Sequence, residues 1–269
     1  MQPELAFSLF GMSFTLKAYV LFALSGALAG IATALPLLKR EGLPIRRALV
    51  LLLAMAAAFL IGARLFNYAI NPRAYDGALH IYTLRLVGLS VYGGILGALC
   101  TLLLYSGLAH VPALRLLDAL VLPAGLAFAL ARVGCYLNGC CAGVATHSRW
   151  GVAFPLSDGE LELLNGLPPL IGSIKPKLSF FPTQLFELSL VLLGLVPILW
   201  LYFRRRLPHG AAFLFYGIWF SAMRLAILPL RSLPYSPAIV HIFYPLFYAF
   251  LITIGLLALS LLYKKNRGR

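Results

Sequence analysis

Seven long apolar segments constrain the fold of this chain more than any other feature of its sequence. They cover residues 18–38, 48–66, 86–108, 116–133, 183–203, 211–230 and 238–263. A helix needs about 20 apolar residues to cross the hydrocarbon core of a bilayer. Hydrophobic residues make up 61% of the chain and charged residues 11%, whereas a soluble domain is about one quarter charged. The sequence therefore predicts an all-α integral membrane protein of about seven transmembrane helices, with residues 1–269 forming a single membrane-spanning domain.

The basic residues indicate how the chain lies in the membrane. The formal net charge of +14 would suit a nucleic-acid partner. However, the basic residues are not gathered on one amphipathic face; they form short clusters between apolar segments, as the positive-inside rule expects. The clusters are Lys39, Arg40, Arg46 and Arg47; Arg204, Arg205 and Arg206; and Lys264, Lys265, Arg267 and Arg269. With seven spans, all three lie on one side, so we expect the N-terminus outside, the C-terminus in the cytoplasm, and no nucleic-acid partner.

Two segments depart from the simple pattern of apolar spans. The longest polar segment, residues 134–182, is rich in glycine and proline, and a loop of that length is usually functional. We expect it to form a small extracytoplasmic head within the membrane domain. In the fourth span, Asp118 and Pro123 interrupt the apolar run, which favours a kinked or re-entrant helix.

Several ionisable residues lie near the predicted outer ends of the spans. They are Arg64, Arg132, Glu187, Arg224 and Arg231. Such residues are costly at membrane depth and by default indicate a functional site. Arg224 and Arg231 are seven residues apart, which places them on one face of the sixth predicted helix. Because guanidinium groups match phosphate oxygens, arginines that converge with one glutamate predict a site for an anionic head group.

A purely structural alternative accompanies each of these residues. Arg64 and Arg231 would then be anchors that extend to the membrane interface. Gly93 and Gly94 would let two helices pack closely. Tyr92 would belong to an interfacial belt of aromatic residues.

Several stretches, taken together and in order, resemble one enzyme family. They are "GARLFNYAINP", "SVYGGILG", "ARVGCYLNGCCAG", "FPTQLFE" and "GAAFLFYGIWFSAMRLAILPLR". The second is similar to S-x-H-G-G-x-x-G, the third to G-R-x-G-N-x-x-N-x-E-x-x-G and the fourth to H-P-[ST]-Q-L-Y-E, which are motifs of the prolipoprotein diacylglyceryl transferase family. Tyr19 also stands where that family carries an N-terminal tyrosine.

The resemblance implies a reaction and its partners. The family moves the diacylglyceryl group of phosphatidylglycerol to the lipobox cysteine of a prolipoprotein, with release of glycerol phosphate and without a cofactor. It therefore implies a multi-pass protein of the bacterial inner membrane that binds phosphatidylglycerol, or another anionic phospholipid, and the signal peptide of a prolipoprotein. Arg132 and Arg224 would hold the lipid phosphate, with Tyr92 and Glu187 completing the catalytic set. The substrate-binding residues implied are Tyr19, Arg64, Gly93, Gly94, Asn138, Gly139, Gly143, Gln184 and Arg231.

The chain departs from the family motifs at acid–base positions. Tyr92 replaces the histidine, Cys135 the first asparagine and Cys140 the glutamate of the signature, and Leu228 replaces a glutamate of the sixth span. A tyrosine hydroxyl, with an ordinary pKa of about 10, is a poor base at neutral pH.

Glu187 and His147 are the remaining candidates for a base. Two other functions stay open. One is a transferase of the same fold with a different acceptor, using Tyr92 or Cys140. The other is a non-catalytic protein that binds or translocates phospholipid.

The three cysteines of the signature allow several interpretations. On a continuous helix Cys135 and Cys140 lie about 140° apart, and the adjacent Cys140 and Cys141 both ligate a metal only if the backbone is irregular. We therefore predict no metal site. The alternatives are packing at a crowded helix end, a disulfide from Cys135 to Cys140 or Cys141, or a thiolate near Arg132 that forms a covalent intermediate.

Overall fold

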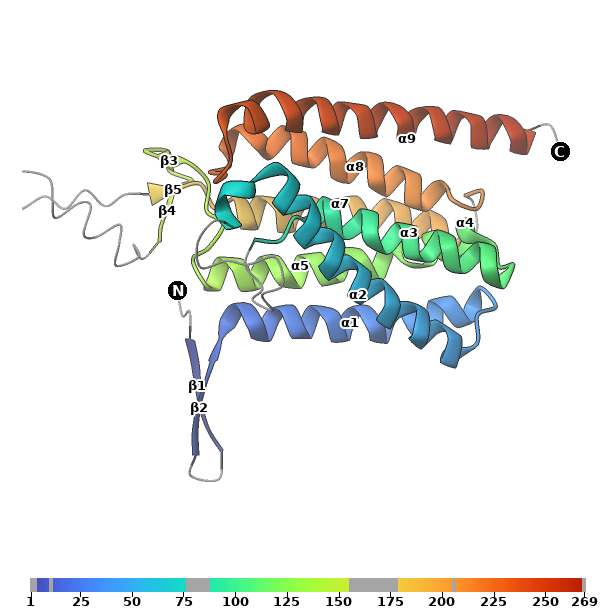
Figure 1. Ribbon diagram of the computed structural model, residues 1–269, viewed down its shortest axis with the longest axis horizontal. Helices are drawn as coiled ribbons and strands as arrows, with labels where there is room; N and C mark the ends of the chain where they lie inside the picture. Colours follow the sequence, from blue (N-terminus) through green and yellow to red (C-terminus); the bar gives the residue numbers. More distant parts are fainter. Residues whose placement is uncertain (1–3, 10–11, 76–87, 155–178, 205–206, 268–269) are drawn as a thin grey trace, which may run out of the picture.

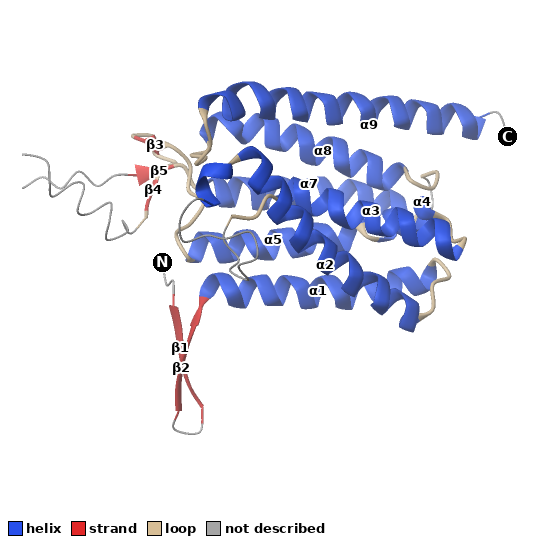
Figure 2. Ribbon diagram, in the orientation of Figure 1, coloured by secondary structure: helices blue, strands red, loops and turns tan. Residues whose placement is uncertain are grey.

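The computed structural model describes residues 4–9, 12–75, 88–154, 179–204 and 207–267 of the chain. Long helices lie side by side in a bundle, and all the strands lie at one end of it (Figure 1, Figure 2). Seven helical spans are long and apolar enough to cross a membrane. The prediction of an all-α membrane protein with seven spans is confirmed, and the chain is a multi-pass membrane protein.

The observed helices follow the predicted spans closely. In chain order they are α1 (Ala18–Arg40), α2 (Ile45–Ile70), α3 (Val91–Ala109), α4 (Ala113–Ala119), α5 (Val121–Leu137), α7 (Thr183–Phe203), α8 (Ala211–Ile227) and α9 (Tyr244–Arg267). Shorter helical turns are η1 (Pro72–Tyr75), η2 (Leu228–Leu230) and the π-helical η3 (Ile239–Phe243).

The third span begins later than predicted, at Val91 rather than near residue 86. Residues 86 and 87 lie outside the described residues. Gly88 has a positive φ of 68°, and Ser90 is extended, with its amide donating to the Ala63 carbonyl over 3.0 Å. This backbone bond to α2 delays the start of the helix.

The fourth span is interrupted, as predicted. It is divided at Leu120 into α4 and α5. The Asp118 carboxylate accepts backbone hydrogen bonds from Gly210 over 2.6 Å and from Phe213 over 2.9 Å. Asp118 therefore satisfies amides at the start of α8, which the helix itself leaves without partners.

The strands form two small sheets. Strands β1 (Glu4–Leu9) and β2 (Met12–Lys17) make an antiparallel hairpin that the sequence analysis did not predict. Strands β3 (Ala145–Thr146), β4 (Val152–Ala153) and β5 (Ser179–Phe180) form a three-stranded sheet in the order β3-β5-β4. This sheet belongs to the predicted head segment, of which residues 155–178 lie outside the described residues.

Helices α2 and α3 pack backbone against backbone, because glycines lie on both sides of their contact. A Cβ atom on Gly93 would lie 2.3 Å from the Gly62 carbonyl oxygen, and one on Gly94 would lie 2.5 Å from the ring of Phe59. Such close approach of small residues is common between membrane helices. The structure thus gives Gly93 and Gly94 the packing role, while a part in substrate binding stays a prediction.

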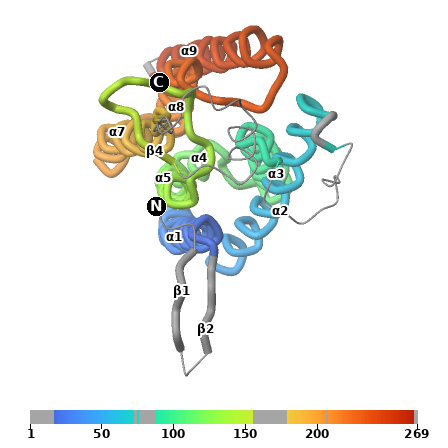
Figure 3. The backbone as a smooth tube through the Cα atoms, turned by 90° about the vertical axis from the view of Figure 1, so that its left-hand side faces the viewer, coloured from blue at the N-terminus to red at the C-terminus, as the bar shows by residue number. Residues whose placement is uncertain are grey.

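The two ends of the bundle differ in character. The strands, the end of α5 and the start of α7 lie at one end, here called the strand end (Figure 1). The turn from α1 to α2, the end of α7, the start of α8 and the end of α9 lie at the other, here called the basic end. Viewed from the strand end, α5 lies near the middle, with α1 below it and α9 above (Figure 3).

Candidate functional site

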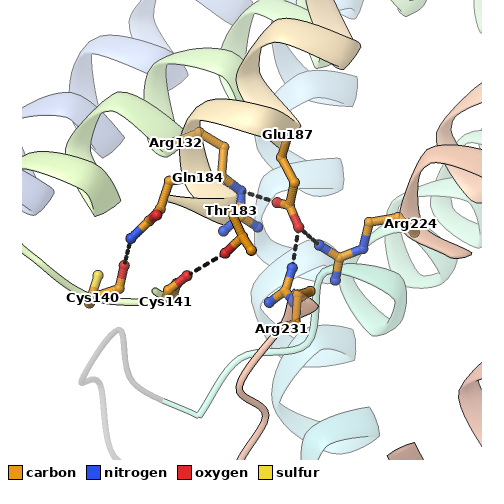
Figure 4. Close-up of polar contacts among 8 residues, drawn as sticks. All are labelled: Arg132, Cys140, Cys141, Thr183, Gln184, Glu187, Arg224 and Arg231. Atoms are coloured by element: carbon orange, nitrogen blue, oxygen red, sulfur yellow. Dashed lines mark hydrogen bonds and ion pairs between the residues drawn. The ribbon is translucent and has the colours of Figure 1, made fainter. Parts of the chain in front are cut away.

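A single buried carboxylate organises the strand end. Glu187, in the second turn of α7, is 1% exposed. Its Oε2 lies 2.8 Å from Arg132 Nε, and its Oε1 lies 2.6 Å from Arg224 Nη1. Arg231 Nη1 also donates to Oε1. The three arginines approach the carboxylate from α5, from α8 and from the segment after α8 (Figure 4).

This arginine cluster, defined as Arg132, Arg224, Arg231 and Glu187, carries excess positive charge. Among the described residues, three guanidinium groups and one carboxylate leave two formal positive charges without a counter-ion. Within the described part of the chain no second carboxylate pairs with these arginines. Burial, followed by the charge of Arg224, lowers the pKa of the Arg231 guanidinium below its ordinary value. Uncompensated buried charge is expensive, so the cluster is suited to an anion.

Arg231 reaches the cluster by a route that the sequence did not indicate. The prediction that it shares a helix face with Arg224 is wrong: α8 ends at Ile227, and after the turn of η2, which contains Pro229, Arg231 is extended. A β-bridge then joins it to Gly143. A Cβ atom on Gly143 would lie 2.2 Å from the Leu230 carbonyl oxygen, so this approach requires glycine.

The end of α5 forms a Schellman motif, which explains part of the signature stretch. Gly139 has a φ of 73°, its amide donates to the Tyr136 carbonyl, and the Cys140 amide donates to the Cys135 carbonyl over 3.1 Å. This pattern satisfies the last carbonyls of a helix and favours glycine at the left-handed position. Asn138 is the last residue before that position, at the C-cap.

The motif also brings the signature cysteines together. In a Schellman motif the third helical residue from the end contacts the residue after the glycine, and these are Cys135 and Cys140. Cys141 adopts a left-handed φ of 62°, which turns the chain back. The sulfurs of Cys135, Cys140 and Cys141 all lie within 4.8 Å of one another. The expectation that these sulfurs diverge is therefore wrong, because the chain is no longer helical beyond Leu137.

The three thiols, here called the cysteine cluster, could hold a metal ion. None of the four cysteines of the chain forms a disulfide in this structure. Hydrogen bonds from the Cys135 and Cys140 thiols lower the pKa of Cys141, and the charges of Arg132 and Arg231 act in the same direction. The cysteine cluster and the arginine cluster are thus electrostatic neighbours.

Helix α7 holds the cysteine loop against the arginine cluster. Gln184 Nε2 donates to the Cys140 carbonyl over 2.7 Å, and Thr183 Oγ1 donates to the Cys141 carbonyl over 3.0 Å (Figure 4). Glu187 follows one turn later on the same helix. Gln184 therefore braces the signature loop. Thr183 was missed by the sequence analysis, although it is adjacent to Gln184 in "FPTQLFE".

The other predicted residues lie around this centre. Tyr92 is 5% exposed, with its ring 5.9 Å from that of Phe220 and 5.3 Å from that of Tyr248, so it is inside the bundle and not in an interfacial belt. Tyr19 is near enough to Arg132 and the cysteine cluster to interact electrostatically. Arg64 is 7% exposed on α2, so its side chain does not extend to the surface as an anchor would.

A second polar group at this end was also missed. Asn67 donates to the Tyr235 hydroxyl over 3.0 Å and accepts from the Tyr75 hydroxyl over 3.0 Å. These bonds connect α2, η1 and the segment before α9. Asn67 follows Arg64 by three residues in "GARLFNYAINP", which is the only signal that the sequence carries for it.

The fold and the site define a class: a multi-pass membrane protein with a buried, positively charged arginine cluster at one end of its helices. The profile of the prolipoprotein diacylglyceryl transferase family matches residues 4–264. The chain belongs to that family.

Individual relatives agree with the family match. A phosphatidylglycerol–prolipoprotein diacylglyceryl transferase of Photorhabdus laumondii is 29% identical over 188 residues, covering 66% of this chain and 63% of the relative. One of Clostridioides difficile is 28% identical over 150 residues, covering 55% and 60%. One of Dehalococcoides mccartyi is 32% identical over 162 residues, covering 60% and 53%. The chain spans less than two thirds of the length of each of these relatives.

Proposed function

We propose that the protein transfers the diacylglyceryl group of phosphatidylglycerol to the cysteine thiol of a prolipoprotein. The observation that carries this proposal is the excess of two positive charges in the arginine cluster. A phosphodiester supplies one negative charge, and its oxygens match guanidinium donors. The names of the relatives support phosphatidylglycerol and a prolipoprotein as the two substrates.

Two buried atoms support a head group that combines phosphate and hydroxyl groups. Arg224 Nε has no hydrogen-bond partner among the described residues, so it can donate to a phosphate oxygen. Gln184 Oε1 is likewise buried without a partner in that part of the chain, and it can accept from a hydroxyl. The glycerol head of phosphatidylglycerol supplies such hydroxyls, which a phosphatidic acid lacks.

The arginines would act on the leaving group. The acceptor sulfur attacks the glyceryl carbon that bears the phosphate ester, the carbon–oxygen bond breaks, and glycerol phosphate departs with one more negative charge. Arg132 and Arg224 would stabilise that charge as it develops, and a donor of this kind typically contributes about 10²–10³ in rate. Arg231 and Glu187 would fix the two guanidinium groups in place before substrate binds.

Glu187 is poorly placed to serve as the base for the acceptor thiol. Its Oε1 accepts hydrogen bonds from Arg224 and Arg231, and its Oε2 forms an ion pair with Arg132 over 2.8 Å. Three positive charges around the carboxylate favour its ionised form and so make it a weak acceptor for a thiol proton. Tyr92 packs among aromatic rings, with its own ring 5.9 Å from that of Phe220 and 5.2 Å from that of Phe247. His147 is exposed next to β3. The proposal therefore assigns Glu187 an electrostatic role. Tyr92 is close enough to Arg224 to interact with its charge.

We place the protein in the bacterial inner membrane, with the strand end and the N-terminus on the outer face. The exposed side chains of Lys39, Arg40, Arg46, Arg47 and Lys264 at the basic end support this orientation, because cytoplasmic loops carry an excess of basic residues. Residues 134–182 would then form a head over the outer ends of the helices.

The test is a transfer assay with the purified full-length chain in detergent. Phosphatidylglycerol and a lipobox peptide are supplied, and mass spectrometry follows the peptide cysteine. We expect a diacylglyceryl mass shift that Arg132→Lys reduces by about 10²-fold and that Arg47→Lys, at the basic end, leaves unchanged. No shift while phosphatidylglycerol still binds would reject transfer to this acceptor.

That last result would favour the second candidate function, a protein that binds or translocates phospholipid without chemistry. Tyr92 in place of the family's histidine is the observation that favours it. Two results together would support this second function. The chain binds phosphatidylglycerol and Arg224→Lys weakens that binding, while no thiol or hydroxyl acceptor yields a product.

A further inference from the structure

The cysteine cluster has the geometry of a partial metal site. Three sulfur ligands within 4.8 Å of one another come from one short stretch of chain. Four-coordinate zinc binds thiolates at about 2.3 Å, which places two ligand sulfurs about 3.8 Å apart. The observed upper limit of 4.8 Å exceeds that separation by about 1 Å, so closing the site on an ion asks for only small movements of the sulfurs.

The backbone around the cluster is held in place for this arrangement. Gly139 and Cys141 both have positive φ, and Cys141 is one of two non-glycine residues in that region among the residues described. Backbone in sparsely populated regions is costly and persists where its surroundings impose it. Here the hydrogen bonds from Thr183 and Gln184 impose it by fixing the carbonyls of Cys141 and Cys140.

Charge also favours a metal in this place. A divalent ion bound by three thiolates carries one net negative charge. Arg132 and Arg231 act electrostatically on Cys141, so this charge would lie beside the arginine cluster. Before the acceptor thiolate binds, one phosphodiester and one such metal centre together balance the two excess positive charges of the cluster.

We propose that Cys135, Cys140 and Cys141 bind a thiophilic divalent ion of the Zn²⁺ type, and that the acceptor cysteine occupies its fourth coordination position. Three protein ligands leave one tetrahedral position open, as in catalytic zinc sites. The second half of the proposal rests on the proposed transferase function; the first half does not.

Coordination would supply what the acid–base positions of the chain lack. A thiol that binds zinc gives up its proton to solvent and is held as a thiolate. The bound sulfur then forms its bond to the glyceryl carbon while the carbon–oxygen bond to phosphate breaks. The thioether product leaves the metal, glycerol phosphate leaves the arginines, and no atom is oxidised or reduced.

A covalent intermediate on the cysteines themselves fits this chemistry less well. If Cys140 or Cys141 took the diacylglyceryl group, the product would be a thioether. A second transfer would have to expel a thiolate from an unactivated carbon. That bond breaks far less readily than a phosphate ester, so the reaction would stop after one turnover.

The metal half is tested with Co²⁺, whose thiolate complexes show sulfur-to-metal charge-transfer absorption. The full-length chain in detergent is reduced, stripped with a chelator and titrated with Co²⁺, and Zn²⁺ then displaces the cobalt. We expect one ion per chain. Replacing any one of Cys135, Cys140 and Cys141 by Ser should weaken binding at least about 10-fold, since even outer-shell changes have that effect. Cys100→Ser, in α3, is the matched control and should bind as the unaltered chain does.

A second readout uses the unaltered chain and does not depend on any variant folding. Alkylation by a maleimide is followed at each cysteine by mass spectrometry, with and without Zn²⁺. Zn²⁺ should slow the reaction of Cys140 and Cys141 and leave that of the exposed Cys100 unchanged. Absence of a charge-transfer band in the reduced chain, or equal protection at Cys100, would overturn the metal site.

The acceptor half is tested on the cobalt-loaded chain without any lipid. A lipobox peptide should change the charge-transfer spectrum as its sulfur joins the metal, whereas the same peptide with serine in place of cysteine should not. This readout needs no turnover, so it separates failure of metal ligation from failure of the proposed reaction. A full rate of transfer by the chelator-treated chain would overturn a role for the metal in activating the acceptor.

Discussion

The two ends of the helix bundle carry the same residue type in opposite physical settings. At the basic end, Arg40, Arg46 and Arg47 are exposed, and the guanidinium of Arg40 lies 5.7 Å above the ring of Phe203. At the strand end, Arg132 and Arg224 are 7% and 8% exposed. Exposed charges are solvated and screened by salt, so they orient a membrane protein at little cost.

Buried arginines need a partner, and the described residues of the strand end provide one carboxylate, that of Glu187, for three of them. The same three positive charges would need no partner at the basic end. The number of arginines and lysines therefore says little about function in a chain of this composition. The number of carboxylates that pair with the buried arginines says much more. The difference can be tested by paired substitutions at the two ends.

The largest effect should come from removing the carboxylate of the arginine cluster. Glu187→Gln removes the one carboxylate that pairs with the three buried guanidinium groups among the described residues, and loss of one partner of a buried ion pair costs about 3–5 kcal/mol. Denaturation in detergent, followed by circular dichroism, measures the change in the free energy of unfolding. Glu41→Gln is the control: Glu41 accepts a hydrogen bond from Tyr202 over 3.0 Å at the basic end, and we expect a loss of about 1 kcal/mol. Similar losses for the two variants would erase the contrast between the ends.

The next effect should be on lipid handling and not on stability. Arg224→Lys keeps the charge but removes the planar group that pairs with Glu187 and phosphate at once. We expect transfer from phosphatidylglycerol to fall by about 10²-fold, while Arg46→Lys at the basic end changes it less than about twofold. An equal fall in both variants would mean that overall charge, and not the arginine cluster, governs the lipid.

A smaller effect should follow from adding one methyl group beside Arg231. Gly143→Ala places a Cβ atom 2.2 Å from the Leu230 carbonyl oxygen, whereas Gly107, near the end of α3, has nothing within 4 Å of the same position. We expect Gly143→Ala to lower the free energy of unfolding by about 1–3 kcal/mol and Gly107→Ala to raise it by up to about 1 kcal/mol. Thermal denaturation of the two variants is compared side by side. An unchanged stability of Gly143→Ala would mean that the bridge to Arg231 does not require glycine at this position.

The smallest loss should come from the buried carboxylate near the basic end. Asp118 accepts hydrogen bonds from the backbone amides of Gly210 and Phe213, and in the part of the chain that the structure describes it forms no ion pair with an arginine. Asp118→Asn retains an acceptor for one of these amides, so we expect a loss of about 1 kcal/mol, typical of a helix cap. A loss as large as that of Glu187→Gln would show that burial alone, without charge pairing, sets the cost of altering a carboxylate here.

The sequence predicted the seven spans and the interrupted fourth helix because hydrophobic length, and an aspartate and a proline within one apolar run, are local signals. It also predicted that arginines converge with one glutamate. It erred at Arg231 and at the cysteines. In both places the chain leaves the helix, at Pro229 and at Gly139, and a helical wheel no longer describes which side chains meet.

The sequence alone thus determined the membrane spans, the basic clusters and the signature stretches, because each depends on residues that are close together in sequence. Which arginines share Glu187, and where the three sulfurs lie, depended on contacts between distant segments: a β-bridge from Gly143 to Arg231, and hydrogen bonds from α7 to the cysteine loop. A carboxylate and a guanidinium attract one another wherever they stand in the sequence. Only the packing of α5, α7 and α8 brings their side chains within about 3 Å, where that attraction and its imbalance take effect.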